Sequence, residues 1–130
     1  MRILLIDDDA AVLEVVSLML ASQGHAVVPA GSGREGLSQL ESGESVDLVL
    51  TDLAMPHMSG WDVVRAVKSR WPAIRVGVVT GTPEHLAGER EVVDALIMKP
   101  VTLESLREGI RQIEASAAPR RESVEGGAGH

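Results

Sequence analysis

The residues best suited to chemistry in this chain stand at the ends of four apolar runs. Ile3–Ile6 leads into Asp7 and Asp8, Val46–Thr51 into Asp52, Val76–Val79 into Thr80, and Ala95–Met98 into Lys99. Short β-rich runs separated by helix-period stretches indicate a parallel sheet, in which the C-terminal ends of the strands gather along one edge. Three carboxylates, a hydroxyl and an ammonium group in one crevice suit a hard divalent cation and a phosphoryl group.

Composition narrows the class of protein. The chain has 130 residues, 45% of them hydrophobic, which is enough for one domain with a real core. The formal net charge of −7 argues against nucleic acid as a direct partner. The absence of cysteine excludes disulfides and cysteine-based zinc sites. No apolar run is long enough to span a membrane, and the start is too short and acidic for a signal peptide, so we expect a cytoplasmic protein.

The periodicity of apolar residues predicts alternating strands and helices. Strands are expected at Arg2–Ile6, His25–Val28, Val46–Thr51, Ile74–Val79 and Ala95–Met98, and helices at Ala10–Ser22, Arg34–Leu40, Gly60–Arg70, Glu84–Val93 and Leu103–Ile113. Asp9 is expected to cap the first of these helices and Thr102 the last. Five strands alternating with five helices predict a doubly wound α/β fold with a parallel sheet.

The end of the chain differs from the rest. Ala115–His130 has no apolar period and finishes in a glycine-rich stretch, so a disordered tail is expected over residues 115–130. The region 1–114 then forms one domain, without internal repeats or room for a second domain.

Four motifs carry a resemblance to a known family. With Asp7-Asp8, the stretch Asp52–Gly60, Thr80 and Lys99-Pro100, the chain resembles the receiver domain of two-component response regulators over Met1 to about Glu114. The motifs occur in order and at compatible spacings. The resemblance implies a flavodoxin-like fold with a five-stranded parallel sheet of order 2-1-3-4-5 and five flanking helices, in which strands 1 and 3 meet at the topological switch point where such folds bind ligands.

The same resemblance implies a magnesium site. Asp8 and Asp52 would bind Mg²⁺ directly, together with the backbone carbonyl of Ala54, and Asp7 would act mainly through a metal-bound water. Asp52 would also be the nucleophile that accepts the phosphoryl group. Carboxylate and carbonyl oxygens are the ligands that Mg²⁺ prefers, which agrees with this assignment.

The remaining implied roles concern the phosphoryl group and its source. The Thr80 hydroxyl and the Lys99 ammonium would contact phosphoryl oxygens, and the Lys99-Pro100 bond would be cis. The donor would be a sensor histidine kinase or a histidine phosphotransfer protein. The domain would catalyse its own phosphorylation and dephosphorylation without being an enzyme for other substrates. It would signal by docking to a separate protein target, as a monomer or weak dimer that binds neither membrane nor nucleic acid.

Two alternative functions fit part of the pattern. A phosphatase of the haloacid dehalogenase type also uses an aspartate after its first strand and another two residues later, which Asp7 and Asp9 imitate. A receiver-like docking module that is never phosphorylated is the second, although it would require the loss of site residues. The stretch Gly31–Gly36 also matches a dinucleotide-binding fingerprint, but it follows the second strand, which carries Pro29, and not the central first strand.

The chain departs from the family at the positions that usually transmit the signal. Receivers commonly carry Tyr or Phe three residues before the lysine, and its rotamer reports the phosphorylation of the aspartate, whereas this chain has Leu96. Val101 replaces the common Phe after Lys-Pro. The helix expected at Glu84–Val93 is also short. The site chemistry should survive these changes, but the aromatic switch is absent.

Overall fold

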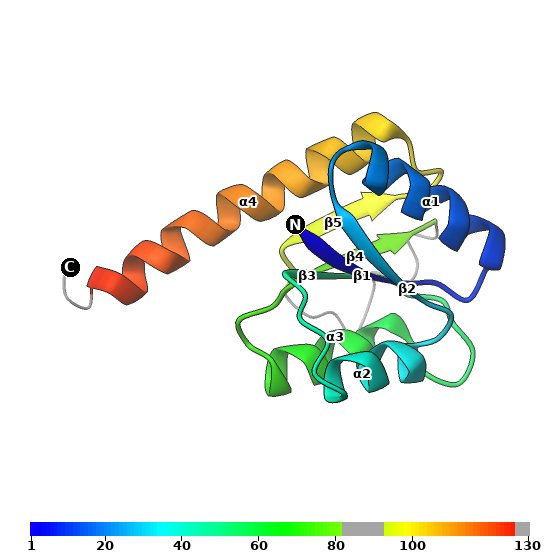
Figure 1. The fold of residues 1–130 in the computed structure, drawn as a ribbon, viewed down its shortest axis with the longest axis horizontal. Helices are drawn as coiled ribbons and strands as arrows, with labels where there is room; N and C mark the ends of the chain where they lie inside the picture. Colours follow the sequence, from blue (N-terminus) through cyan, green and yellow to red (C-terminus); the bar gives the residue numbers. More distant parts are fainter. Residues whose placement is uncertain (82–92, 127–130) are drawn as a thin grey trace.

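A five-stranded parallel sheet forms the centre of the protein. The structure is a computed structural model and describes residues 1–81 and 93–126. The strands are β1 (Arg2–Ile6), β2 (Ala26–Ala30), β3 (Leu48–Asp52), β4 (Arg75–Thr80) and β5 (Ala95–Met98). Their order in the sheet is β2-β1-β3-β4-β5, and every neighbouring pair is parallel (Figure 1). The doubly wound fold and its strand order are therefore confirmed.

Helices cover both faces of this sheet. They are α1 (Ala10–Ser22), α2 (Gly33–Glu41), α3 (Gly60–Arg70) and α4 (Leu103–Gly126). In Figure 1, α2 and α3 lie side by side on one face, whereas α1 and the first part of α4 lie on the other. Within the described residues no helix is long and apolar enough to cross a membrane.

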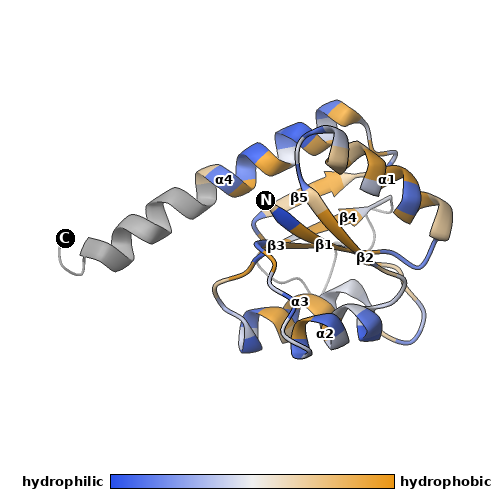
Figure 2. Ribbon diagram, viewed as in Figure 1, coloured by the Kyte–Doolittle hydropathy of each residue, from blue (hydrophilic) through white to orange (hydrophobic). Residues whose placement is uncertain are grey.

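Two hydrophobic cores lie on opposite faces of the sheet. Along β1, Leu4 and Ile6 belong to the core beneath α2 and α3, while Ile3 and Leu5 belong to the core beneath α1 and α4. This alternation follows from the two-residue period of a strand, because successive side chains point to opposite faces. A strand buried on both faces is largely apolar, and Figure 2 shows the hydrophobic colour along most of β1, whose exposed first residue Arg2 is hydrophilic.

The element boundaries differ in small but useful ways from those predicted. Asp52 and Thr80 are the last residues of β3 and β4, whereas the sequence pattern placed them just after the strands. Each therefore makes part of the sheet's hydrogen-bonded ladder and is held more firmly than a loop residue would be. Asp9 caps α1, because its side chain accepts hydrogen bonds from the backbone N–H groups of Ala11 and Val12. The predicted cap is confirmed.

The helices differ from the prediction in two places. The helix expected at Glu84–Val93 lies outside the described residues except for its last position, so the part of the chain that the structure describes contains four helices and not five.

The last helix was predicted to end at Ile113, but α4 continues to Gly126 and extends away from the sheet (Figure 1). Apolar periodicity marks only the packed part of a helix. The residues that follow include alanine, arginine and glutamate, which have high helix propensity, as well as Pro119, which does not. The assignment of residues 115–130 to a tail outside the domain remains a prediction.

Two glycines of the fingerprint-like stretch serve close packing. A Cβ atom at Gly33 would lie 2.8 Å from Val63 Cγ2 and 2.9 Å from Met58 Sδ, and one at Gly36 would overlap the side chain of Ile6. Both glycines therefore let α2 approach β1 and α3 closely. In addition, the Glu35 carboxylate accepts a hydrogen bond from the backbone N–H of Gly31 and so occupies the turn where a dinucleotide phosphate would bind. The rejection of dinucleotide binding is supported.

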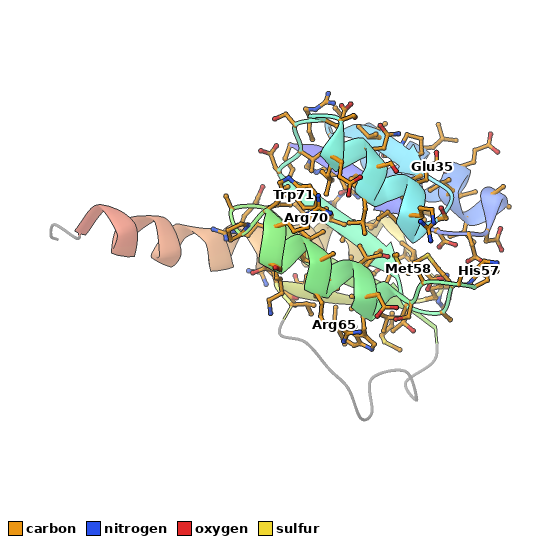
Figure 3. The ribbon with its side chains drawn as sticks, turned by 90° about the horizontal axis from the view of Figure 1, so that it is seen from below. Glu35, His57, Met58, Arg65, Arg70 and Trp71 are labelled. Carbon is orange, nitrogen blue, oxygen red and sulfur yellow. The ribbon has the colours of Figure 1, made fainter. Side chains whose placement is uncertain are left out.

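The face formed by α2 and α3 is visible from below in Figure 3. At one end of α3, the Arg70 guanidinium stacks 4.4 Å from the centre of the Trp71 ring and forms a 2.7 Å ion pair with Glu41 of α2. At the other end, His57 and Met58 lie in the loop that follows β3 (Figure 3). The Arg70–Glu41 ion pair connects α3 with α2 at the end of α3 that is far from this loop.

Candidate functional site

The four predicted strand ends meet at one edge of the sheet. Asp7 follows β1, Asp52 ends β3, Thr80 ends β4 and Lys99 follows β5. Because β1 and β3 are neighbours, their C-terminal acids lie side by side at the switch point of the sheet. The backbone N–H of Lys99 donates a 2.9 Å hydrogen bond to the carbonyl of Thr80, which continues the pairing of β4 with β5 and brings Lys99 to the same edge.

Three carboxylates form an acidic cluster at this edge. Single oxygen atoms of Asp7, Asp8 and Asp52 all lie within 4.8 Å of one another. Asp7 and Asp52 are only 4% and 6% exposed, whereas Asp8 is open to solvent. Oxygen atoms at this spacing can contact a single cation, and an all-carboxylate donor set with one side open to water suits a hard divalent ion such as Mg²⁺.

Lys99 bridges the two buried carboxylates. Its Nζ atom lies 3.3 Å from Asp7 Oδ2 and 3.5 Å from Asp52 Oδ2, and its side chain is 26% exposed. The Lys99-Pro100 peptide bond is cis, as the resemblance implied. The sequence predicted that Lys99 reaches the site, and the structure adds that one ammonium group serves two acids.

Burial and charge oppose each other at Asp52. Desolvation, and then the nearby Asp7 carboxylate, raise the pKa of Asp52 above its ordinary value, and the attraction of Lys99 only partly offsets them. The desolvation comes from an apolar floor, in which a cavity of about 10 Å³ is lined by Leu5, Ile6, Asp7, Val12, Val16, Asp52 and Val79. For Lys99, burial lowers the pKa, but Asp52 and Asp7 outweigh it and hold the pKa above the usual value.

Asp7 is fixed by its neighbours. Its Oδ1 atom accepts a 2.9 Å hydrogen bond from the backbone N–H of Asp9, its Oδ2 atom faces Lys99, and its own N–H donates to the carbonyl of Ala30. An acid held in this way is better placed to orient the site than to attack a substrate. The Asp9 carboxylate is engaged in capping α1, which argues against the paired-aspartate chemistry of a dehalogenase-type phosphatase.

The loop after β3 depends on a glycine whose role sequence reasoning missed. A Cβ atom at Gly60 would overlap the backbone carbonyl of Asp52 and lie 2.8 Å from Leu53 Cα. The Gly60 N–H donates a 3.0 Å hydrogen bond to the Leu53 carbonyl, so α3 starts directly against the end of β3. The sequence held a signal for this start, because Ser59 and Asp62 form a reciprocal capping box.

Two other residues of this loop have notable backbone or burial properties. His57 adopts a φ angle of 71°, which few side chains tolerate, although histidine is among those found there. Ala54 lies between Asp52 and this turn and is exposed. The role of its backbone carbonyl as a metal ligand remains a prediction.

These features define a class of protein before any relative is considered. A doubly wound parallel sheet carries, at its switch point, a buried aspartate flanked by two further acids and a lysine. The model of the response regulator receiver domain family matches residues 3–111, and the chain belongs to this family.

Relatives of known name agree with this assignment. The chain is 35% identical over 121 residues to the transcriptional regulatory protein GlrR of Escherichia coli K12, covering 91% of this chain and 27% of GlrR. It is also 35% identical over 101 residues to the DNA-binding response regulator MtrA of Mycobacterium tuberculosis H37Rv, covering 76% of this chain and 44% of MtrA. The chain thus spans about a quarter to a half of the length of these relatives.

Solved structures share the whole fold. A CheY-like receiver domain protein from Methanospirillum hungatei JF-1 has a TM-score of 0.78 and 32% identity, over 92% of this chain and 97% of the other. The response regulator TrrA from Thermotoga maritima, solved in complex with Mg²⁺ and BeF, has a TM-score of 0.78 and 25% identity, over 86% of this chain and 97% of TrrA.

Proposed function

We propose that this domain accepts a phosphoryl group on Asp52 from the phosphohistidine of a sensor histidine kinase or a histidine phosphotransfer protein. The observation that carries the proposal is the placement of Asp52, which is 6% exposed and lies beside Asp7, Asp8 and Lys99 at one sheet edge. Membership of the receiver family supports the same assignment. No other described cluster of acidic and metal-ligating side chains has this character.

Mg²⁺ is the cofactor that the site fits. Asp8 and Asp52 would hold it directly with the carbonyl of Ala54, while Asp7, already engaged with Lys99 and the Asp9 N–H, would act through a bound water. When bound, the ion would supply positive charge to the phosphoryl oxygens and so lower the barrier to transfer. The complex of TrrA with Mg²⁺ and BeF supports this choice.

The chain's own residues would then carry out the transfer. An Asp52 oxygen attacks phosphorus and forms a P–O bond as the P–N bond to the donor histidine breaks, and the electron pair of that bond returns to the imidazole. Lys99 faces two carboxylates before the reaction. Once Asp52 is an acyl phosphate, we expect its ammonium group to follow the negative charge to the phosphoryl oxygens, where the Thr80 hydroxyl would also bind.

The consequence of phosphorylation would be docking to a separate protein. We infer a cytoplasmic signalling domain that catalyses only its own phosphorylation and dephosphorylation. The usual aromatic switch is replaced by Leu96, whose side chain is 36% exposed on β5. An aliphatic side chain has no hydroxyl group that could exchange hydrogen-bond partners when Asp52 is phosphorylated. We therefore expect phosphorylation to alter mainly the loops after β3 and β4, where the phosphoryl group can make direct contacts.

A small-molecule donor tests the proposal without a partner. Acetyl phosphate with Mg²⁺ should add one phosphoryl group to the wild type, as measured by intact-mass spectrometry, and none to Asp52→Asn. Asp7→Asn should still be labelled, because Asp7 is not the nucleophile, and EDTA should suppress labelling. Label that persists in Asp52→Asn but disappears in Asp7→Asn would favour the phosphatase alternative. No labelling of the folded wild type would favour the docking module.

A further inference from the structure

Thr51 is a buried polar residue that directly precedes Asp52, the proposed phosphoacceptor. It lies in β3 between Ile6 of β1 and Val78 of β4, and it is 0% exposed. Valine has nearly the same shape and also favours strands, and its burial would not require the desolvation of a hydroxyl group. The packing of the sheet therefore does not explain why this position carries a hydroxyl group.

The Thr51 hydroxyl group is bonded to the backbone at Asp52. Its Oγ1 atom donates a 2.9 Å hydrogen bond to the Asp52 carbonyl. The same carbonyl lies against the start of α3, where a Cβ atom at Gly60 would overlap it. Asp52 is the last residue of β3, so this carbonyl belongs to the peptide group with which the chain leaves the strand. Both the hydroxyl group and the helix start therefore restrict how that peptide group can rotate.

The other end of the same peptide group contacts the Asp52 carboxylate. Burial, and then the charge of Asp7, raise the pKa of Asp52, whereas Lys99 and the Leu53 N–H lower it, the N–H by donating a hydrogen bond to the carboxylate. A peptide group is planar, so its C=O and its N–H turn together. A hydroxyl group that fixes the Asp52 carbonyl therefore also fixes the N–H that binds the Asp52 carboxylate.

The orientation of this carboxylate matters for the proposed reaction. The attacking oxygen must be aligned with the phosphorus atom and the leaving group, and small misplacements slow such reactions. The Lys99 ammonium contacts the carboxylate from one side, 3.5 Å from Oδ2. A single contact leaves the carboxylate free to turn about the bond that joins it to the Cβ atom, whereas a second one from the backbone restricts this rotation.

We propose that Thr51 is a positioning residue for the phosphoacceptor, whose hydroxyl group holds the Asp52–Leu53 peptide group so that the Leu53 N–H orients the Asp52 carboxylate for attack. The inference rests on the proposed function for its reaction, but the arrangement of the peptide group belongs to the metal-free protein. Loss of the hydroxyl group should slow phosphoryl transfer without abolishing it, because Asp52, Lys99 and the acidic cluster stay in place.

Thr51→Val and Thr51→Ser separate the hydroxyl group from the shape of the side chain. The labelling of each variant by acetyl phosphate at saturating Mg²⁺ is followed over time by intact-mass spectrometry. Thr51→Val should be labelled about three- to tenfold more slowly than the wild type, which corresponds to the loss of one ordinary hydrogen bond. Thr51→Ser retains a hydroxyl group and should react within about twofold of the wild-type rate.

A second measurement concerns the metal-free protein. The Leu53 amide hydrogen should exchange with deuterium about three- to tenfold faster in Thr51→Val in EDTA, relative to the amide hydrogens of β1, which correct for overall stability. In Thr51→Ser this ratio should stay close to the wild-type value. Val49→Ala is the matched control, because it removes buried methyl groups from the same face of β3. It should lower the melting temperature but leave the labelling rate and the exchange ratio nearly unchanged.

These results distinguish the inference from the proposed function. A wild type that takes no label would refute the proposed function, and the Leu53 exchange ratio would still decide whether Thr51 holds the peptide group. Three results would overturn the inference: an exchange ratio unaffected by Thr51→Val, a Thr51→Val variant labelled as fast as the wild type, or a Thr51→Ser variant no better than Thr51→Val.

Discussion

Replacing Lys99 with methionine tests whether one ammonium group holds two buried acids together. Methionine keeps a similar length and apolar stem but removes the charge that lies 3.3 Å from Asp7 and 3.5 Å from Asp52. The variant leaves two carboxylates, with oxygen atoms no more than 4.8 Å apart, facing each other without a cation. We expect the metal-free protein to lose stability.

The size of this loss follows from the distances. Each contact of Lys99 is worth about 5 kcal/mol at an effective permittivity of about 20 and about 1 kcal/mol in bulk water. The side chain is 26% exposed, so the screening lies between these limits, and removal of the lysine also ends its own desolvation cost. We expect a loss of about 2–4 kcal/mol in the free energy of unfolding near pH 7.5, in the range found when a buried pair loses one partner.

The stability loss caused by Lys99→Met should depend on pH, because Asp52 titrates differently in the folded and unfolded protein. Burial and Asp7 already raise the pKa of Asp52, and removal of Lys99 takes away the group that opposes them. A raised pKa means that the folded protein takes up a proton more readily than the unfolded chain, so the folded variant gains relative stability as the pH falls toward the ordinary value of 3.8. The difference between variant and wild type should therefore shrink between about pH 7.5 and about pH 4.5.

Urea denaturation in EDTA at both pH values measures this loss, and adding Asp52→Asn to the variant provides the control. The double variant should recover part of the stability, because only one buried carboxylate then remains. Mg²⁺ should stabilise Lys99→Met more than the wild type, since the ion would supply the missing charge. A loss below about 0.5 kcal/mol, the usual size of a surface substitution, or an equal loss at the two pH values, would refute this account of the site.

Three further variants probe other features. Ser17→Ala should raise the free energy of unfolding by about 1 kcal/mol in urea, because the buried Ser17 hydroxyl has no hydrogen-bond partner among the described residues; a loss would show that the hydroxyl is satisfied. Burial, and then the N-terminal ammonium, lower the pKa of His25 below 6.5, and Glu114 opposes this shift only in part. The free energy of unfolding should therefore fall as the pH drops below 6.5, and His25→Gln should make melting curves less dependent on pH in this range. Gly60→Ala should cost about 1–3 kcal/mol and weaken Mg²⁺-dependent stabilisation, because its Cβ would lie 2.8 Å from Leu53 Cα; an unchanged melting curve would contradict the packing described here.

Much of the fold was predictable because apolar periodicity is a local property. The strand order was implied by the family resemblance, and the positions of the strands followed from short apolar runs that are buried on both faces. The end of α4 was not predictable in this way, since the helix continues to Gly126 beyond the apolar pattern that ends at Ile113. The sequence beyond Ile113 has no apolar period and contains Pro119, and proline disfavours a helix interior by about 3 kcal/mol, so neither the pattern nor the propensities predicted a helix there.

The sequence predicted which residues form the site but not the contacts that they make with one another. The sequence brought Asp7, Asp8, Asp52 and Lys99 to one edge because parallel strands end together. It did not predict that the Lys99 ammonium would contact both Asp7 and Asp52, since such contacts depend on side-chain conformations that the sequence pattern does not determine. The need for glycine at position 60 was also missed, because a close approach between α3 and the end of β3 leaves no local pattern.

The acids and the lysine of the site lie far apart in the sequence, and this separation affects when the site can form during synthesis and folding. Asp7 and Lys99 are 92 residues apart, and β1 lies between β2 and β3, so the ion pair exists only after nearly the whole sheet has assembled. A chain that emerges from the ribosome at about 5–20 residues per second would expose its first acids for several seconds before the lysine appears. Chains that end before β5 would contain the three aspartates but not the lysine that lies between two of them, so the ion pair of Lys99 with Asp7 reports completed folding.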